Sequence, residues 1–396
     1  MKRGVILPRL CRWDKLNRLF RVDFQGESVK IGIAVALLTA LAGSTQPIRA
    51  QATDAPPATN RIAADDSRLL LLGQIDSRDP KRPRLGYPGT GIILRFQGAS
   101  LTLDLSSDSE KSALTIVVDH GAPALQLLQK GEQSILVASG LDTSPHTAEI
   151  YKRTETWQGV LTLLGIELPA DGKLLAPPPL PARKLLFVGD SVTCGAGVEN
   201  NSTCTGDPAH PANDVYDSYG MELGRRLDAQ THLVCYGGRG VDRDYRWLGI
   251  ADNILNAPQF LDLSIASDEP SGRAPWKFSQ WTPDAVFVSL GTNDFNLQKT
   301  KPLDGDAFVE DYARLLMTLR SHYPRAAIFA TEGAIVTDPL LRKYVQDAVQ
   351  RTHDARIQWV EATHYPGNGC DGHPTRAQHL HMADDIEPVL RKALSW

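Results

Sequence analysis

The chain has 396 residues, with 42 Lys and Arg, 46 Asp and Glu and a formal net charge of −4, and it is long enough for two domains. Residues 1–50 hold nine basic and three acidic side chains, so the remainder has 33 basic and 43 acidic residues and a net charge of −10. This acidic balance, without basic runs, argues against nucleic acid and anionic membrane surfaces as partners.

Residues 31–43 form an apolar run of thirteen after a basic, irregular leader. A membrane-spanning helix needs about 20 apolar residues. We therefore predict that residues 1–50 are a signal peptide cleaved after Ala50, which makes the mature protein secreted or periplasmic without stable membrane association. The alternative is an uncleaved membrane anchor. Residues 51–60 are predicted to be a flexible N-terminus.

Residues 61–175 show short apolar runs with period-two alternation, separated by Gly, Asp and Ser clusters. This pattern predicts a small antiparallel β-sandwich, with strands near 93–96, 101–105, 114–118, 134–137, 147–151 and 161–168. Residues 176–183 contain four prolines within five positions and are predicted to be an extended linker.

Residues 184–396 alternate buried strands with amphipathic helices. Apolar runs at 184–188, 285–290, 326–330 and 357–360 predict strands, and helical spacing over 308–319 and 340–349 predicts helices. The fold class is therefore α/β, a doubly wound parallel sheet preceded by the sandwich.

The first of these strands ends in Gly189, Asp190 and Ser191. Open α/β folds place their chemistry at the carboxyl edge of the sheet, so Ser191 is the candidate nucleophile. A serine hydroxyl needs a base and an oxyanion site around it to react. The simpler role for Ser191, capping the next helix, is compatible with this one.

Two further blocks follow in order, Gly-Thr-Asn-Asp at 291–294 and Asp-Gly-His-Pro at 371–374. Together with the Gly-Asp-Ser block, they resemble the SGNH (GDSL-type) hydrolases over residues 184–396. The sandwich ahead of that region, the segment 85–98 and the segment 275–284 resemble the two-domain acetyl esterases of carbohydrate esterase family 2. We expect the sandwich to be jelly-roll-like.

The resemblance implies a serine esterase that removes O-acetyl groups from plant cell-wall polysaccharides such as acetylated xylan or glucomannan. The partner is then an acetylated polysaccharide or oligosaccharide, and no metal or organic cofactor is implied. One alternative is an esterase for another acyl substrate: a short-chain lipid, a thioester or peptidoglycan O-acetate. The other is a non-catalytic carbohydrate-binding protein, against which the intact Ser191, Asn293 and His373 argue.

His373 is the candidate general base, because neutral imidazole can accept the serine proton near pH 7. His379 and His381 are its nearest rivals, but they fall within a predicted helix. Asp371 is the candidate third member of a triad. The superfamily usually places its acid three residues before the histidine, whereas here the spacing is two, and some family members use a backbone carbonyl instead. Triad and dyad both stay open.

The oxyanion hole requires N–H donors aimed at the tetrahedral intermediate. We predict the Ser191 backbone N–H and a glycine N–H from the loop at 236–240, with Gly238 preferred over Gly240 because glycine allows close approach. By resemblance, the Asn293 side chain is the remaining donor. Asp190 and Asp294 are expected to brace the two loops.

Trp276 is the preferred sugar-binding residue, since exposed indoles stack on pyranose faces. Outside the leader there are four cysteines: Cys194, Cys204, Cys235 and Cys370. An even number in an exported protein permits disulfides, of three possible connectivities, but buried free thiols fit the pattern equally well.

Overall fold

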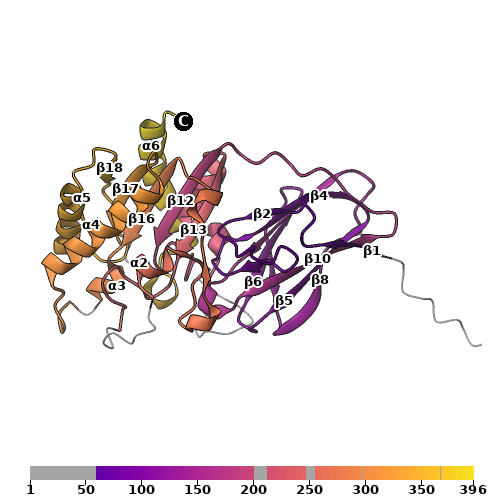
Figure 1. Ribbon diagram of the computed structural model, residues 1–396, viewed down its shortest axis with the longest axis horizontal. Helices are drawn as coiled ribbons and strands as arrows, with labels where there is room; N and C mark the ends of the chain where they lie inside the picture. Colours follow the sequence, from indigo (N-terminus) through magenta and orange to yellow (C-terminus); the bar gives the residue numbers. More distant parts are fainter. Residues whose placement is uncertain (1–58, 200–211, 247–254, 297, 366) are drawn as a thin grey trace, which may run out of the picture. The chain divides into compact units, whose positions relative to one another are not determined.

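The computed structural model describes residues 59–199, 212–246, 255–296, 298–365 and 367–396 (Figure 1). The predicted signal peptide and its cleavage site lie outside these residues, as does Cys204. The described residues belong to one compact unit. Within the described ranges no helix is both long and apolar enough to cross a membrane.

Residues 59–174 form two antiparallel sheets packed as a sandwich. The first sheet has the order β1 (Thr59–Ala63), β10 (Leu161–Pro169), β5 (Ser100–Ser107) and β8 (Gly131–Ser139), with β3 (Arg84–Leu85) beside β10. The second has the order β11 (Lys173–Leu174), β4 (Gly91–Gln97), β9 (His146–Lys152), β6 (Ala113–Val118) and β7 (Ala124–Leu127), with β2 (Leu70–Leu72) beside β4.

The sandwich core follows the alternation of its strands. Leu101, Leu103 and Leu105 of β5 are buried in one cluster with Phe96 of β4 and Ile150 of β9. All six predicted strands are present, and β1, β2, β3, β7 and β11 are additional short ones. The first strand begins at Thr59, so it includes the last two residues of the segment 51–60 that was predicted to be flexible. These two residues are ordered because they pair with the end of β10.

Residues 175–182 contain no helix or strand, since β11 ends at Leu174 and β12 (Arg183–Gly189) begins at Arg183, the last residue of the predicted linker. The parallel sheet that follows has the order β13 (Ala229–Cys235), β12, β16 (Ala285–Leu290), β17 (Ala327–Glu332) and β18 (Ile357–Trp359). Its helices are α1 (Tyr219–Arg226), α2 (Ala257–Phe260), α3 (Thr292–Phe295), α4 (Gly305–His322), α5 (Pro339–Arg351) and α6 (Arg376–Leu394), and a hairpin joins β14 (Leu263–Ile265) to β15 (Ala274–Pro275).

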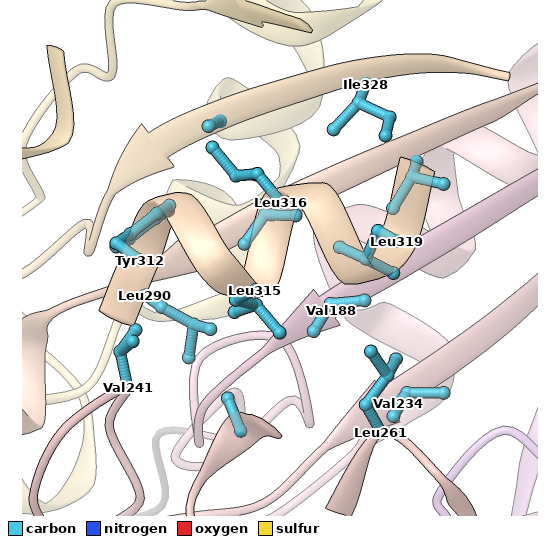
Figure 2. Close-up of a cluster of buried hydrophobic side chains, with 14 of the residues drawn as sticks. Val188, Val234, Val241, Leu261, Leu290, Tyr312, Leu315, Leu316, Leu319 and Ile328 are labelled. Carbon is cyan, nitrogen blue, oxygen red and sulfur yellow. The ribbon is translucent and has the colours of Figure 1, made fainter. Parts of the chain in front are cut away.

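Both faces of the parallel sheet are covered, which explains its continuous apolar strands. Leu186 and Val188 of β12 belong to the core cluster that contains α4 and α5, and Figure 2 shows α4 side chains over Val188 and Ile328. Leu185 and Phe187 belong to the opposite cluster, with α1 and α6. Successive β12 residues therefore anchor the strand from both sides.

The register of β12 sets the position of the reactive loops. Gly189, at its carboxyl end, lies opposite Cys235 of β13 and Ser289 of β16. β12 is the first strand in sequence and lies between the second and the third, which is a topological switch point of the sheet. The loops that carry Ser191, Gly238 and Asn293 consequently leave the same edge of the sheet side by side.

Candidate active site

Ser191 lies in a tight turn directly after β12. The turn is closed by the bonds from Cys194 N–H to the Asp190 carbonyl (3.1 Å) and from Ala196 N–H to the Ser191 carbonyl (2.9 Å). The buried Asp190 carboxylate accepts the Val192 N–H at 3.0 Å, and burial raises the pKa of Asp190 to about 6. These bonds fix the loop while Ser191 stays partly exposed.

His373 contacts Ser191 directly, with 2.7 Å between Nε2 and the serine Oγ. The loop backbone permits this approach because Gly197 has no side chain: a Cβ there would lie 2.6 Å from the Cβ of His373. The Nδ1 of His373 lies 3.1 Å from the Cys370 carbonyl oxygen. That carbonyl can only accept, so Nδ1 carries the proton and Nε2 presents its lone pair to the serine hydroxyl.

Asp371 does not supply the hydrogen bond that a triad requires. Its side chain is exposed, its backbone is in the left-handed region at φ 54°, and the Cys370 carbonyl takes the Nδ1 proton. The short spacing to His373 is the physical reason, because Asp371 belongs to the 3₁₀ turn η5 (Cys370–Gly372) that leads into the histidine. In this geometry Ser191 and His373 form a hydrogen-bonded pair, and we propose that they act as a dyad without Asp371.

Burial lowers the pKa of His373, while the Cys370 carbonyl and the charge of Asp371 act in the opposite direction. The rival histidines lie in α6, as predicted. His379 is fully buried and accepts the Tyr219 N–H at 3.2 Å, and burial lowers its pKa to about 3. His381 is exposed. Neither takes the place of His373 beside the serine.

The glycine-rich loop after β13 forms a turn closed by Arg239 N–H and the Tyr236 carbonyl, 3.4 Å apart. Gly238 has φ +76° at the third position, as a type II turn requires. The Tyr245 ring lies against Gly238, where an added Cβ would come within 2.7 Å of Cδ1. The Tyr245 N–H also bonds the Gly238 carbonyl at 2.9 Å. Any other residue at position 238 would therefore strain the backbone and clash with the Tyr245 ring.

Asn293 and Asp294 connect α3 to this loop. The Asn293 amide donates to the Arg239 carbonyl at 2.9 Å. The buried Asp294 carboxylate accepts the backbone N–H groups of residues 241–243 at 2.8–3.2 Å, and burial raises its pKa to about 6. Asp190 and Asp294 thus brace the two loops, as predicted.

The two glycine candidates for the oxyanion hole differ in their surroundings. Gly240 is buried, and a Cβ there would lie 2.2 Å from Oδ2 of Asp294, so its small size serves the packing of that carboxylate. Gly238 is only partly buried. Gly238 stays our prediction for the donor, together with the Ser191 N–H and the second N–H of Asn293.

A disulfide joins the Ser191 loop to the end of β13, between Cys194 and Cys235, and both residues are fully buried. Cys370, at the start of the histidine loop, is also disulfide-bonded. These cysteines are therefore cross-links rather than free thiols. Within the described residues, no cluster of three or more His, Cys, Asp or Glu is arranged to hold a metal ion.

Both halves of the chain match families of known proteins. Residues 71–178 match the carbohydrate esterase 2 N-terminal family, and residues 187–367 match the GDSL-like lipase/acylhydrolase family. An acetylxylan esterase/glucomannan deacetylase of Cellvibrio japonicus is 32% identical over 85% of this chain and 92% of its own length. The chain belongs to carbohydrate esterase family 2.

Solved structures of family 2 esterases agree with this assignment. One from Cellvibrio japonicus has a TM-score of 0.79 and 31% identity, covering 86% of this chain and 99% of that one. One from Clostridium thermocellum, in complex with cellohexaose, has a TM-score of 0.74 and 29% identity, covering 83% and 99%. The cellulase/esterase CelE of Acetivibrio thermocellus is 31% identical, over 84% of this chain and 40% of its own length. The protein is thus a carboxylic ester hydrolase of the carbohydrate esterase class.

Trp276 of this family 2 esterase is not beside the serine. It lines a cavity of about 660 Å³ with His232 and Trp281 of the same half and with sandwich residues, and neither Ser191 nor His373 lines it. Its indole packs against the hydrophobic core, with its ring centroid 6.1 Å from that of His232. The structure therefore does not bring Trp276 to the reactive pair.

The sandwich of the esterase supplies residues that sequence reasoning missed. Glu155, after β9, is 2% exposed and accepts the Gly237 N–H at 2.6 Å. The Trp157 side chain hydrogen-bonds the Glu155 carboxylate and is 54% exposed. The sequence signal is a run of polar and charged residues at 152–156, which begins at the last residue of β9.

Proposed function

We propose that this protein is a serine esterase that removes O-acetyl groups from acetylated plant cell-wall polysaccharides, xylan or glucomannan. One observation carries the proposal: the 2.7 Å bond between His373 Nε2 and Ser191 Oγ at the carboxyl edge of the sheet. The similarity to an acetylxylan esterase/glucomannan deacetylase over most of both chains supports the choice of substrate.

The geometry supports an acyl-enzyme reaction in two steps. His373 takes the Ser191 proton on Nε2 as the serine oxygen attacks the acetyl carbonyl, and the Cys370 carbonyl stabilises the imidazolium through Nδ1–H. The N–H groups of Ser191, Gly238 and the Asn293 amide stabilise the oxyanion. His373 then gives the proton to the leaving sugar oxygen. Water, deprotonated by the same histidine, attacks the acetyl-enzyme, the bond between the acetyl carbon and Ser191 Oγ breaks, and His373 returns the proton to Oγ as acetate leaves.

Two exposed aromatic residues flank the loop that carries Gly238. Tyr245 packs against Gly238 and is 45% exposed, and Trp157 bonds the carboxylate that holds Gly237. We propose these rings, rather than Trp276, as the sugar platform. Trp157→Ala should raise KM for acetylated polysaccharide. KM for p-nitrophenyl acetate should stay unchanged, because this small ester has no sugar chain to stack on the two rings.

The test of substrate is acetate release from acetylated glucomannan, acetylated xylan and O-acetylated peptidoglycan, measured side by side. The proposal expects the two plant polysaccharides to be the faster substrates. A chain-length series of p-nitrophenyl esters is the companion measurement, in which kcat/KM should fall steeply from acetate to octanoate. Comparable values on octanoate would favour a lipid or thioester substrate, and faster release from peptidoglycan would favour that substrate.

We also propose that residues 1–50 direct export to the periplasm or the medium and are then removed. The apolar run at 31–43 and the disulfide between Cys194 and Cys235 support this, since disulfides persist in oxidising compartments. N-terminal sequencing of the exported protein should begin near Gln51. An exported chain that keeps residues 31–43 would contradict the proposal.

A further inference from the structure

A carboxylate from the sandwich reaches the glycine-rich loop of the catalytic half. Glu155 Oε2 accepts the Gly237 N–H at 2.6 Å, and Glu155 is 2% exposed. An added Cβ on Gly237 would lie 2.7 Å from Oε2 and 2.8 Å from Oε1, so the whole carboxylate lies against this glycine. The contact joins residues 82 positions apart in the sequence.

This bond holds the Tyr236–Gly237 peptide, which directly precedes the peptide that carries the Gly238 N–H. Glu155 holds the Gly237 N–H on one side of that peptide, and Tyr245 N–H holds the Gly238 carbonyl on the other at 2.9 Å. The peptides on both sides of the Gly237–Gly238 peptide are therefore held, and the Tyr245 ring lies against Gly238 between them. Preorganised donors stabilise an oxyanion because they need no reorganisation during the reaction.

Glu155 is itself held rigidly from within the sandwich. Its backbone N–H donates to the Gln158 side chain at 3.0 Å, and its carbonyl accepts Lys152 Nζ at 3.0 Å. Lys152 is fully buried and donates to the Thr154 carbonyl as well. The indole of Trp157 adds a bond to the carboxylate. The acceptor for Gly237 is thus fixed before any substrate binds.

The buried lysine also limits the electrostatic cost of placing a carboxylate near a developing negative charge. Burial raises the pKa of Glu155 to about 7 and lowers the pKa of Lys152 to about 7. The charge of Lys152 lowers the pKa of Glu155, so a protonated Lys152 offsets the charge that the Glu155 carboxylate places near the oxyanion.

We infer that Glu155 is a positioning residue of the oxyanion hole, so the sandwich is part of the catalytic unit. The inference rests on the proposed role of Gly238. It assigns Glu155 no contact with substrate and no proton transfer. Its effect passes through the Gly237 N–H to the orientation of the Gly238 N–H.

The test compares Glu155→Ala with Glu155→Gln, using p-nitrophenyl acetate so that the result does not depend on the glycan. Glu155→Ala removes the acceptor, and kcat should fall about 10- to 100-fold with KM nearly unchanged, since misplacement by about 1 Å can cost about a hundredfold. Glu155→Gln keeps an oxygen acceptor, and kcat should stay within about fivefold of wild type. If Glu155→Ala does not fold, Glu155→Met replaces it as a variant of similar volume.

Asp104→Ala is the matched control. Asp104 is another buried carboxylate of the sandwich, 4% exposed, and its Oδ1 accepts the Ser134 hydroxyl at 2.6 Å within the same sheet. This variant should lower the melting temperature without changing kcat. A Glu155→Ala variant with unchanged kcat, or a Glu155→Gln variant as slow as Glu155→Ala, would overturn the positioning role.

A double-mutant cycle with Asn293→Ala separates the oxyanion hole from general weakening. The effects on kcat of two residues that act on one oxyanion should be non-additive. Glu155→Ala should therefore lower kcat by a smaller factor in the Asn293→Ala background than in wild type. Full additivity would overturn the inference. Failure to release acetate from polysaccharide, with these p-nitrophenyl acetate results intact, would instead reject only the proposed substrate.

Discussion

His373 is oriented through the backbone, since its Nδ1 lies 3.1 Å from the Cys370 carbonyl oxygen while Asp371 points into solvent. A backbone carbonyl fixes the tautomer as a carboxylate would, but it carries no full charge. The sequence could predict Ser191 and His373 from their motifs. It could not decide the orienting group, because one residue of spacing determines whether a carboxylate reaches Nδ1.

Asp371→Asn tests that assignment. We expect kcat to stay within about fivefold of wild type, whereas loss of an orienting carboxylate can cost about 10⁴. The neutral histidine is the base and burial lowers its pKa, so the acidic limb of kcat/KM should have its midpoint below pH 6.5. Because the charge of Asp371 raises that pKa, the variant should move the limb to lower pH. A loss of about a hundredfold or more in a folded variant would restore the triad.

Asn293→Ala tests the oxyanion hole at a single donor. Removing one such donor typically costs about 2.7–4 kcal/mol of barrier, so kcat should fall about 10²- to 10³-fold. Part of the loss will come through the Arg239 carbonyl, which the Asn293 amide also bonds. Thermal melting of the variant is the control, and a loss under about tenfold in the folded protein would place the donor elsewhere.

At the scale of elements, the loop after β12 and the end of β13 are joined both by strand register and by the disulfide from Cys194 to Cys235. Period-two and helical spacing were sufficient to predict β4, β5, β12, β16, α4 and α5. They could not predict strands of two to five residues such as β1 and β3, which form only because β10 offers them an edge. Nor could they place Trp276, since an indole in a core and an indole on a surface have the same local pattern.

The disulfide is predicted to stabilise this edge of the sheet. It closes a separation of 41 residues, and bridges of this kind typically contribute about 2–4 kcal/mol. The double variant Cys194→Ala/Cys235→Ala should lose that much free energy of unfolding in urea. An unchanged denaturation midpoint would show that packing alone holds the two loops together.

At the scale of the whole molecule, the sandwich and the catalytic half share buried polar contacts. Tyr87 donates its hydroxyl to the Phe260 carbonyl at 2.6 Å, and Arg153 pairs with Asp214 at 2.6 Å and Glu199 at 2.8 Å. Sequence analysis treated the two halves as separate because a proline-rich segment divides them. Contacts between residues far apart in the chain leave no periodic signal, so the sequence could not reveal this interface.

Arg153→Ala should show how much the interface contributes to stability. The side chains of Arg153 and Asp214 are 4% and 3% exposed, so the variant leaves a buried carboxylate unpaired, which typically costs about 3–5 kcal/mol. Arg82→Ala is the control, because its pair with Glu132 is exposed and should contribute less than about 1 kcal/mol. Equal urea midpoints for the two variants would contradict this account of the interface.

The central claim is that Ser191 deacetylates plant polysaccharide, and acetate release from acetylated glucomannan by wild type and by Ser191→Ala tests it most directly. We predict steady release by wild type and none above the uncatalysed rate by the variant, with both proteins melting at similar temperatures. Undiminished release by Ser191→Ala, or no release by folded wild type, would contradict the account.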